Sequence, residues 1–577
     1  MIKPKKSVEN MSGYFVPLFE KERDVKIDSN ENNYGPSPKV IEALRNCDYK
    51  NISFYPFYGE LSQKIADYQN VQIDNIKVTN GADEALQAIV QTYLEKDEAL
   101  LTLDISFAMP EIYTEIQGGR VIKVPFEKQW EFPTENFIKN LSNPEVKIVY
   151  LASPNNPTGN IIKECDLAKI LENSRDKVVI IDETYANYSG STYKNYVKDY
   201  DNLFVVKSFS KDFALAGMRL GYIISNSANI ENLKKVVSPF SVNSFAMKAG
   251  IAALIDVEYF KNVRSLIVKS RAELKTFFES LGAFVYESEA NFLLVNFGEK
   301  AEFVYKKLLQ ENIAVKLFAK GGRLENHLRV TIPTDYGVTR IKQALSNKIS
   351  LVFDMDGVLV DARNSYRAAI QKTYEKYTGK TVTPEKIQAV KNLGGMNNDW
   401  DLTEYLLKKD GLNIPYAEIV QSFQEIYWAD GAGLINNETP LFDRKLFEKL
   451  SKKYNLSIFT GRLYNEANFA LKKFNSCVLF TTLVTTDDIP DGKGKPDPYG
   501  LNMTKGKTIS EKYFYFGDTI DDVKAAKAAG YIAVGVLPPQ DKSEELADAL
   551  KKSGADFVLK SINDIEMVLE QKNEAVC

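Results

Sequence analysis

The sequence contains few residues of the kinds that bind zinc or form disulfides. Its 577 residues include 4 cysteines, which are far apart and form no CxxC pair, and a single histidine, His327. This composition excludes a disulfide-rich secreted module and argues against a zinc site. No run is apolar enough to cross a bilayer, and 73 basic residues stand against 77 acidic ones. We therefore expect a cytoplasmic protein that binds neither nucleic acid nor membrane.

The length and the hydrophobic pattern indicate several α/β units. At about 100–200 residues per domain, 577 residues correspond to about three to five structural units. Apolar, β-branched runs such as 178–181 alternate with amphipathic stretches such as 82–94 and 163–173. This alternation is typical of α/β layers around a largely parallel sheet.

A boundary between two domains lies near residue 348. The amphipathic stretch 338–345 ends one helical pattern, and a new apolar strand begins at 349–353. No linker rich in proline, glycine or serine separates the two. We predict a first domain over 1–347 and a second over 348–577.

Four motifs follow one another in the first domain. Those at 153–159 and 182–185 come after strand-like runs, and those at 208–211 and 217–219 come next in the chain. They contain the side chains that a pyridoxal phosphate (PLP) site needs. Lys211 can bind the cofactor aldehyde and move a proton. Asp182 can hold the protonated ring nitrogen, and Asn156 and Tyr185 are suited to the ring phenolate oxygen.

The phosphate of such a cofactor favours the start of a helix, hydroxyl groups and a fixed cation. Ala82 and Asp83 stand at a predicted helix start. Ser208 and Ser210 supply the hydroxyl groups, and Arg219 supplies the cation. Each of these motifs alone is more often an ordinary turn or helix start, and their joint order carries the prediction.

On these motifs, residues 25–346 resemble the fold-type-I aminotransferases, most of all the histidinol-phosphate aminotransferase family. Further similar segments are 28–38, 54–56, 80–84 and 328–331. The resemblance implies a large sheet domain with a small α/β subdomain, and a homodimer with shared sites. It also implies that Tyr55 reaches the cofactor phosphate of the neighbouring subunit, that Phe107 stacks on the cofactor ring and that Arg329 binds the substrate anion.

Three positions depart from the family pattern. Asn33 replaces a usual proline, and 105–107 replace a common Pro-Thr-aromatic sequence. Lys316 stands where the family usually has an arginine that helps to hold the substrate phosphate. A lysine offers a point charge there instead of a planar fork, so the substrate becomes less certain while the reaction class does not.

The second domain contains a different set of motifs after strand-like runs, at 353–361, 457–462, 492–498 and 516–522. Two aspartates two residues apart, a hydroxyl, a lysine and further aspartates are the parts that phosphoryl transfer through an aspartate requires. On these motifs, residues 350–565 resemble the haloacid dehalogenase superfamily of phosphatases, with a Rossmann-like fold.

The resemblance assigns a role to each motif. Asp354 would be the nucleophile and Asp356 the general acid/base, while Thr460 and Lys495 would bind the phosphate. Oxygen ligands favour Mg²⁺ as the metal. Its ligands would be Asp354, the carbonyl of Asp356 and Asp518, with Asp522 as outer support and Asp521 as the alternative to it.

About a hundred residues between the first two of these motifs show helical patterns, and we predict a helical cap at about 365–450. A cap favours a small phosphorylated metabolite as substrate. The polar segment 394–401 around Trp400 either contacts the substrate or forms a turn between cap helices.

Together the two domains predict transamination of a keto-phosphate followed by dephosphorylation of the product. The leading substrate is imidazole-acetol phosphate, with glutamate as amino donor, giving histidinol phosphate and then histidinol in histidine biosynthesis. The alternatives are dihydroxyacetone phosphate, giving serinol, and decarboxylation of a phosphorylated amino acid. A ligand-sensing protein with degenerate sites is disfavoured because Lys211, Asp354 and the other required side chains are present.

Overall fold

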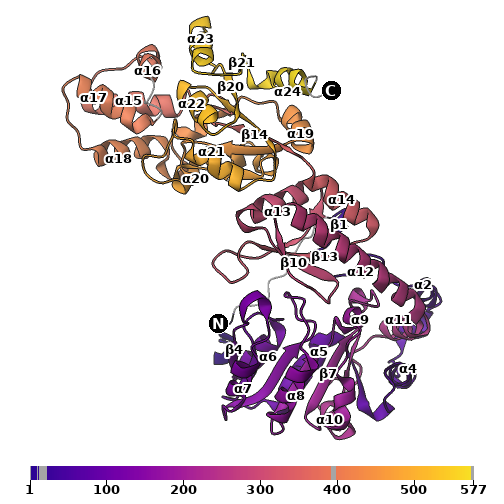
Figure 1. The fold of residues 1–577 in the computed structure, drawn as a ribbon. Helices are drawn as coiled ribbons and strands as arrows, with labels where there is room; N and C mark the ends of the chain where they lie inside the picture. Colours follow the sequence, from indigo (N-terminus) through magenta and orange to yellow (C-terminus); the bar gives the residue numbers. More distant parts are fainter. Residues whose placement is uncertain (1, 10, 12–21, 392–397, 574–577) are drawn as a thin grey trace. The chain divides into compact units, whose positions relative to one another are not determined.

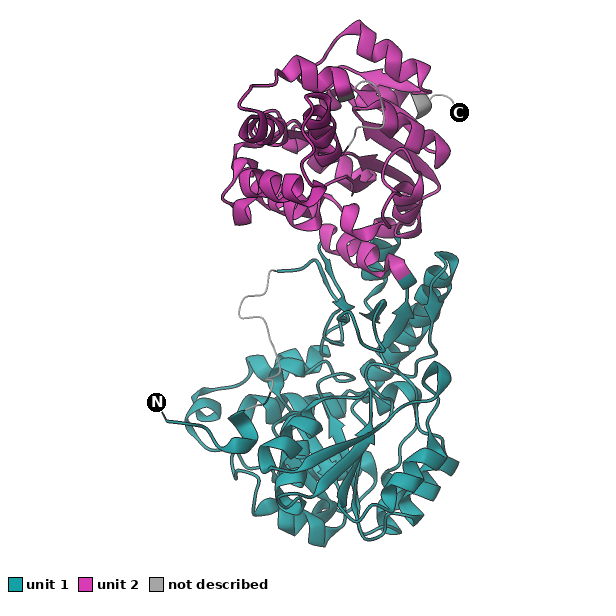
Figure 2. Ribbon diagram, turned by 90° about the vertical axis from the view of Figure 1, so that its left-hand side faces the viewer, with its two compact units in different colours: residues 1–298, 312–342 teal, residues 299–311, 343–577 magenta. Residues whose placement is uncertain are grey.

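The computed structural model describes residues 2–9, 11, 22–391 and 398–573, and its chain divides into two compact units (Figures 1 and 2). Unit 1 comprises residues 1–298 and 312–342, and unit 2 comprises residues 299–311 and 343–577. Helix α13 (Ala301–Gln310) therefore groups with unit 2, although it precedes residue 348. The domain limits given by the sequence stay a prediction.

A seven-stranded sheet forms the centre of unit 1. In spatial order its strands are β2 (Ile76–Thr79), β8 (Gly221–Ile224), β7 (Leu203–Ser208), β6 (Val178–Asp182), β5 (Val146–Ala152), β3 (Ala99–Leu103) and β4 (Arg120–Val124). Neighbouring strands are parallel, except that β8 is antiparallel to β2 and β7. The predicted α/β class with a largely parallel sheet is confirmed.

Helices cover both faces of this sheet (Figure 1). In β5, Ile148 and Tyr150 belong to the core on one face, and Val149 and Leu151 belong to the core on the other. Because successive side chains of a strand point to opposite faces, a sheet buried on both faces requires a continuous apolar run. The helices that flank the sheet are α4 (Gly59–Gln69), α5 (Gly81–Tyr93), α6 (Met109–Gln117), α7 (Thr134–Leu141), α8 (Glu164–Glu172), α10 (Ser227–Lys234) and α11 (Ser244–Ile255).

A smaller antiparallel sheet completes unit 1. Its order is β12 (Lys316–Leu317), β13 (His327–Thr331), β10 (Phe292–Asn296) and β9 (Phe284–Val285). The long helix α12 (Val257–Ser280) precedes it and α14 (Asp335–Leu345) follows it. Nearer the start of the chain, β1 (Val25–Lys26) pairs with β11 (Ile313–Ala314), and α2 (Pro38–Arg45) and α3 (Tyr49–Ser53) follow.

Unit 2 contains a six-stranded parallel sheet. Its spatial order is β18 (Thr482–Val484), β17 (Asn455–Phe459), β14 (Ile349–Phe353), β19 (Lys512–Gly517), β20 (Ile532–Val536) and β21 (Phe557–Leu559). The chain starts in the middle, at β14, and extends to both sides. Ligands of such sheets bind at the carboxyl ends of the strands beside the point where the strand order reverses. The helices packed on the sheet are α19 (Arg444–Lys453), α20 (Tyr464–Lys473), α21 (Tyr499–Gly506), α22 (Ile520–Ala528), α23 (Glu544–Lys552) and α24 (Glu566–Asn573).

Four helices form a cap with a hydrophobic core of its own. They are α15 (Tyr366–Thr378), α16 (Pro384–Lys391), α17 (Asp399–Lys409) and α18 (Tyr416–Tyr427). The chain enters the cap through β15 (Val360–Asp361) and leaves through β16 (Thr439–Pro440), and these two short strands pair. Helix α19, which the predicted limits of 365–450 include in the cap, packs on the sheet core through Phe447 and Leu450 instead.

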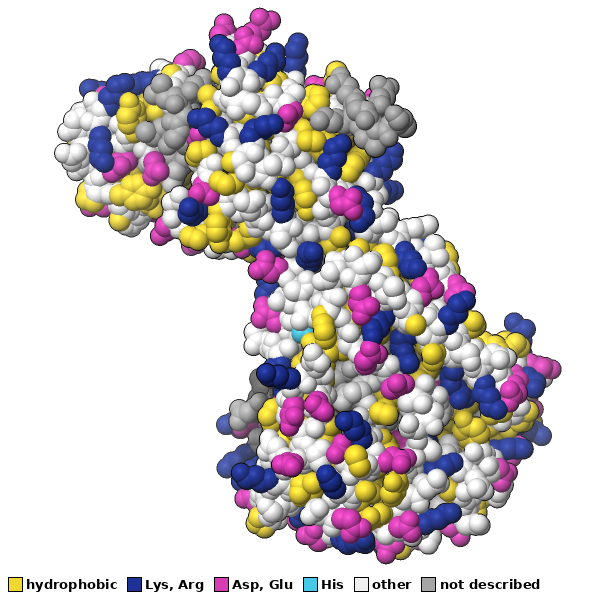
Figure 3. Space-filling model, in the orientation of Figure 1, with side chains coloured by type: hydrophobic (Ala, Val, Ile, Leu, Met, Phe, Trp, Pro, Cys, Tyr) yellow, Lys and Arg dark blue, Asp and Glu magenta, His cyan; other side chains and the backbone are white. Residues whose placement is uncertain are grey.

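Charged side chains of both signs are interspersed over the face drawn in Figure 3. Among the described residues, no helix is both long and apolar enough to cross a membrane.

Candidate active sites

The predicted PLP side chains of unit 1 meet at the carboxyl edge of its sheet. Asp182 is the last residue of β6, Ser208 is the last residue of β7, and α5 begins at Gly81 directly after β2. Strands that run in one direction bring their ends to one edge, which is where α/β sheets bind ligands. Sequence motifs that lie far apart in the chain are thereby brought to one place.

Lys211 lies in this group with its amine held by the backbone. Its Nζ donates a hydrogen bond to the carbonyl of Ser29 at 2.8 Å. Burial, together with the positive charges of Arg329 and Arg219, lowers the pKa of Lys211 to about 8, while the charge of Glu31 opposes the shift. An amine with such a pKa is neutral in an appreciable fraction near pH 7–8, and the neutral form is the nucleophile.

Asp182 is buried and fixed by two donors. The hydroxyl of Tyr150 donates to its Oδ2 at 3.0 Å, and the backbone N–H of Thr184 donates to its Oδ1 at 2.9 Å. Burial raises the pKa of this carboxyl group, and the hydrogen bonds oppose the rise. A buried carboxylate whose charge is only partly compensated suits a cationic ring nitrogen.

Asn156 and Tyr185, the two predicted partners of the ring oxygen, each contact a further polar side chain. Arg329 donates from Nη1 to Oδ1 of Asn156 at 2.8 Å, and Asn30 donates from Nδ2 to the hydroxyl of Tyr185 at 3.0 Å. Because of this hydrogen bond, Asn30 orients a predicted site residue. Asn30 lies in the segment 28–38 that resembles the family, but the sequence alone assigned it no role.

The predicted phosphate-binding residues surround the first turn of α5. Gly81 has a φ of +75°, and a Cβ atom there would lie 3.0 Å from the Arg219 guanidinium, so the position favours glycine. Arg219 pairs with Asp83 at 2.7 Å. Ser208 accepts a hydrogen bond on Oγ from the backbone N–H of Ser210 at 3.1 Å. A helix N-terminus, hydroxyl groups and a cation are thus close together, as an anion site requires.

The remaining predicted residues of unit 1 differ in exposure. Lys316 lies directly opposite Arg329 in the register of β12 and β13, so the two cations share a face of the small sheet. Phe107 is half-buried and packs against the core. Tyr55 is 71% exposed and stacks on Phe240 with ring centroids 4.4 Å apart.

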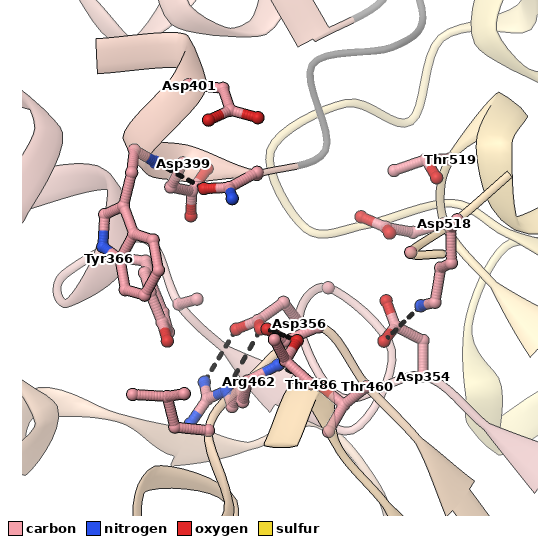
Figure 4. Close-up of a pocket in the computed structure, with 18 of the residues that line it drawn as sticks. Asp354, Asp356, Tyr366, Asp399, Asp401, Thr460, Arg462, Thr486, Asp518 and Thr519 are labelled. Atoms are coloured by element: carbon pink, nitrogen blue, oxygen red, sulfur yellow. Dashed lines mark hydrogen bonds and ion pairs between the residues drawn. The ribbon is translucent and has the colours of Figure 1, made fainter. Parts of the chain in front are cut away.

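The second candidate site lies at the carboxyl edge of the sheet of unit 2. Asp354 follows the central strand β14, while Thr460 and Asp518 follow its two neighbours, β17 and β19. Figure 4 shows Asp354 and Asp518 close together and Asp356 beside Arg462. Gly357 has a φ of +78°, and a Cβ atom there would lie 2.2 Å from Oδ2 of Asp518. Only glycine lets the chain turn so close to that carboxylate.

Lys495 joins two carboxylates in a buried ion-pair cluster. Its Nζ lies 2.7 Å from Oδ1 of Asp354 and 2.7 Å from Oδ1 of Asp522. Burial raises the pKa of Asp354 to about 7, although the Lys495 ammonium opposes the rise. The attraction of both carboxylates raises the pKa of Lys495, so the amine stays charged.

Asp522 has the surroundings of a residue that positions others. Its Oδ1 accepts a hydrogen bond from the Tyr515 hydroxyl at 3.0 Å, and its Oδ2 accepts from the N–H and the hydroxyl of Thr519 at 3.0 and 2.7 Å. Carboxylate oxygens of Asp354, Asp518 and Asp522 nevertheless lie within 4.8 Å of one another, a spacing that one cation can bridge.

A cavity of about 660 Å³ opens above these carboxylates, between the sheet and the cap. The cap contributes polar and aromatic side chains to its wall, among them Tyr366, Arg367, Asp399, Trp400 and Tyr416. In Figure 4, Asp399 and Asp401 lie across the opening from Asp354 and Asp356. Of the polar segment 394–401, residues 394–397 lie outside the described residues.

Sequence reasoning assigned no role to the partners of Asp356. Arg462 donates to both oxygens of that carboxylate and also pairs with the buried Glu438. The position of Arg462, two residues after Thr460, was a usable signal. Glu438 belongs to no local sequence motif. Only the tertiary fold brings it to the site, so the sequence alone could not identify it.

Comparison with known families finds a different family model for each part of the chain. The model of the aminotransferase class I and II family matches residues 22–345, and that of the haloacid dehalogenase-like hydrolases matches residues 351–536. The first match covers more than half of the chain. The chain therefore belongs to the aminotransferase class I and II family, with a haloacid dehalogenase-like hydrolase fused behind it. It is an enzyme that joins a transaminase to a phosphatase.

Similar curated proteins cover the first half of the chain. The histidinol-phosphate aminotransferase of Clostridium beijerinckii is 32% identical over 333 residues, which are 56% of this chain and 91% of that protein. The enzyme of the same name from Caldanaerobacter subterraneus subsp. tengcongensis is 33% identical over 334 residues, 56% of this chain and 93% of that protein.

Solved structures resemble the same half. The histidinol-phosphate aminotransferase from Clostridium acetobutylicum matches with a TM-score of 0.52 and 26% identity, over 56% of this chain and 98% of that one. That from Sinorhizobium meliloti, in complex with pyridoxal-5'-phosphate, matches with a TM-score of 0.53 and 24% identity, over 56% of this chain and 89% of that one. The latter likeness concerns the fold alone.

Proposed function

We propose that unit 1 transfers an amino group from glutamate to imidazole-acetol phosphate, and that unit 2 hydrolyses the histidinol phosphate so formed to histidinol. The single observation that carries the proposal is that Lys316 stands opposite Arg329, whose charge acts on Lys211, in a chain that also has a phosphatase domain. A transaminase substrate that carries a phosphate would suit both features.

The residues of unit 1 fit PLP as cofactor. Lys211 offers an amine of lowered pKa, Asp182 a buried carboxylate, and the start of α5 with Arg219 an anion site. When bound, the cofactor would withdraw electrons from the carbon that carries the amino group. Lys211 would hold the cofactor and move protons at Nζ, while Asp182 would hold the ring proton.

A homodimer is part of this proposal. Tyr55 belongs to a group of exposed large hydrophobic side chains on and after α3, and such groups mark interaction surfaces. The group consists of Tyr49, Ile52, Phe54, Tyr55 and Phe57, with Phe240 beside it. A second copy of this chain would cover it and would place Tyr55 at the partner's cofactor.

The residues of unit 2 fit Mg²⁺, since Asp354 and Asp518 offer hard oxygen ligands within reach of one ion. When bound, the ion would neutralise charge on the phosphoryl group. Asp354 would attack phosphorus, Lys495 and Thr460 would hold the phosphoryl oxygens, and Asp356 would give the leaving oxygen its proton. Asp522 would hold Lys495 in place.

The choice of carbon skeleton rests on the relatives, whose name specifies histidinol phosphate. Imidazole-acetol phosphate would also bury apolar ring area in the pocket, at about 25 cal/mol per Å². The smaller dihydroxyacetone phosphate has no such observation in its favour. Decarboxylation of a phosphorylated amino acid has none either.

The test compares histidinol phosphate with serinol phosphate on the full-length protein. Each is assayed for phosphate release and, in reverse transamination with 2-oxoglutarate, for glutamate formation. We expect both halves to prefer histidinol phosphate by at least about tenfold in kcat/KM. If the two halves prefer different amines, the proposal that both reactions act in succession on one metabolite is wrong.

A further inference from the structure

A buried charged cluster surrounds the carboxylate of Asp356, and Arg462 lies at its centre with 1% of its side chain exposed. Its Nε and Nη2 donate to the two oxygens of Asp356 at 3.0 and 2.7 Å. Its Nη1 and Nη2 donate to Glu438, which is fully buried, at 2.9 Å each. Two-point contact between a guanidinium and a carboxylate fixes direction as well as distance.

Glu438 connects this cluster to the cap. It immediately precedes β16, through which the chain leaves the cap. Its Oε1 accepts hydrogen bonds from the Ser365 hydroxyl at 2.9 Å and from the Tyr427 hydroxyl at 3.2 Å. Ser365 precedes α15, where the chain enters the cap, and Tyr427 is the last residue of α18. One carboxylate therefore contacts both connections between cap and sheet.

Packing alone does not account for this arrangement. Removing the two charged groups of Arg462 and Glu438 from water is costly, and apolar side chains of the same volume are often as stable. The ring of Tyr366 also packs against the Arg462 guanidinium, with 5.1 Å between Cζ and the ring centroid, so the cation is enclosed from the cap side as well. The open end of the cluster is the carboxylate of Asp356, which lines the cavity.

We propose that Arg462 and Glu438 are positioning residues of the phosphatase site, which hold Asp356 in the direction for proton transfer and make that direction depend on the cap. The proposal rests on the proposed phosphatase chemistry, but not on which amine is the substrate. As Asp354 bonds to phosphorus, the ester P–O bond breaks and Asp356 gives its proton to the leaving oxygen. Asp356 then takes a proton from the water that attacks phosphorus, and the bond to Asp354 breaks.

Substrates whose leaving groups differ in basicity distinguish a role in proton transfer from a general loss of structure at the site. An alkyl phosphate leaves as a strongly basic alkoxide and needs the proton, whereas p-nitrophenolate leaves without one. The alkyl ester in this test is histidinol phosphate or serinol phosphate, whichever the wild type hydrolyses faster. In the full-length variants Glu438→Gln and Arg462→Lys, we expect the first turnover of this ester to slow about 100-fold, with little change in KM. The burst of p-nitrophenolate from p-nitrophenyl phosphate should keep its rate within about threefold.

The control for loss of a buried charge is the double variant Arg462→Met/Glu438→Met, which removes both fully buried charges together, takes the cation only from the partly exposed Asp356, and is expected to regain melting temperature. Arg444→Lys, in an exposed pair with Glu448, controls for the substitution itself. Equal slowing of both esters, or recovery of alkyl-phosphate turnover together with stability in the double variant, would overturn the proposal. A wild-type chain that hydrolyses neither alkyl ester contradicts the proposed function itself.

Discussion

The two candidate sites differ in how far the chain itself completes them. In unit 2, Lys495 pairs with Asp354 and Asp522, Arg462 pairs with Asp356, and a cap from the same unit covers the cavity. In unit 1, the cations Lys316 and Arg329 share one face, and Tyr55 lies exposed. The site of unit 2 is organised by ion pairs within the protein. The site of unit 1 has the features expected of one that an anionic cofactor and a partner subunit would complete, as we propose.

This difference predicts different sensitivities. A site that is preorganised by buried ion pairs should fail when one member changes and should remain indifferent to oligomeric state. A site that is completed by a cofactor and a partner subunit should change its activity with protein concentration, cofactor concentration and pH, because binding of both stabilises its arrangement.

The largest effect is expected from Asp354→Asn in unit 2. An amide does not attack phosphorus, so phosphate release should fall by about 10⁴-fold or more. EDTA should imitate the loss, because the neighbouring carboxylates of Asp518 and Asp522 are suited to Mg²⁺. Transaminase activity of the same preparation is the control and should stay unchanged. Phosphate release that resists both treatments would remove Asp354 from its proposed role.

Lys211→Ala is the matching change in unit 1. Without the amine, transamination should fall by about 1,000-fold or more, and the visible absorbance of bound cofactor should disappear on dialysis. Phosphate release should be retained, since the two sites belong to separate compact units. A variant that keeps its transaminase activity contradicts the assignment of Lys211.

Tyr55→Ala tests whether unit 1 needs a partner. If the hydroxyl of Tyr55 binds the cofactor phosphate of a second copy, its loss should weaken PLP binding about tenfold, measured by titration of the apoenzyme. Tyr55→Phe keeps the ring that stacks on Phe240, so it should weaken PLP binding as much and leave the dimer intact in sedimentation. Tyr464→Ala, an exposed tyrosine of unit 2, is the control. A monomeric wild type with full PLP affinity would exclude the shared site.

The elements that carry the motifs could be predicted from the sequence because local patterns determine them. The strand expected at 349–353 is β14, and the helix expected at 82–94 is α5, displaced by one residue because Gly81 begins the first turn. Strands that are buried on both faces are apolar at every position. The helices that cover them carry apolar residues at a spacing of three to four. These signals depend on neighbours in the chain.

The partners of the site residues depend on the tertiary fold and could not be predicted in this way. Tyr150 donates to Asp182 because β5 and β6 are adjacent, and Glu438 reaches Arg462 because the chain returns from the cap. No motif links such residues in sequence. The order of strands in each sheet is likewise set by long-range packing, which a single sequence does not display.

The smallest effect is expected from pH. The positive charge of Arg329 lowers the pKa of Lys211, so Arg329→Gln should raise that pKa from about 8 toward 10.5, although burial, the largest cause, remains. Only the neutral amine binds the aldehyde. The rate of PLP binding to apoenzyme should therefore rise through a midpoint near pH 8 in the wild type, and at up to about one pH unit higher in the variant. Lys316→Gln removes the opposite cation on β12 and should leave the midpoint in place. A midpoint that stays or falls in Arg329→Gln would show that the charge of Arg329 does not act on Lys211.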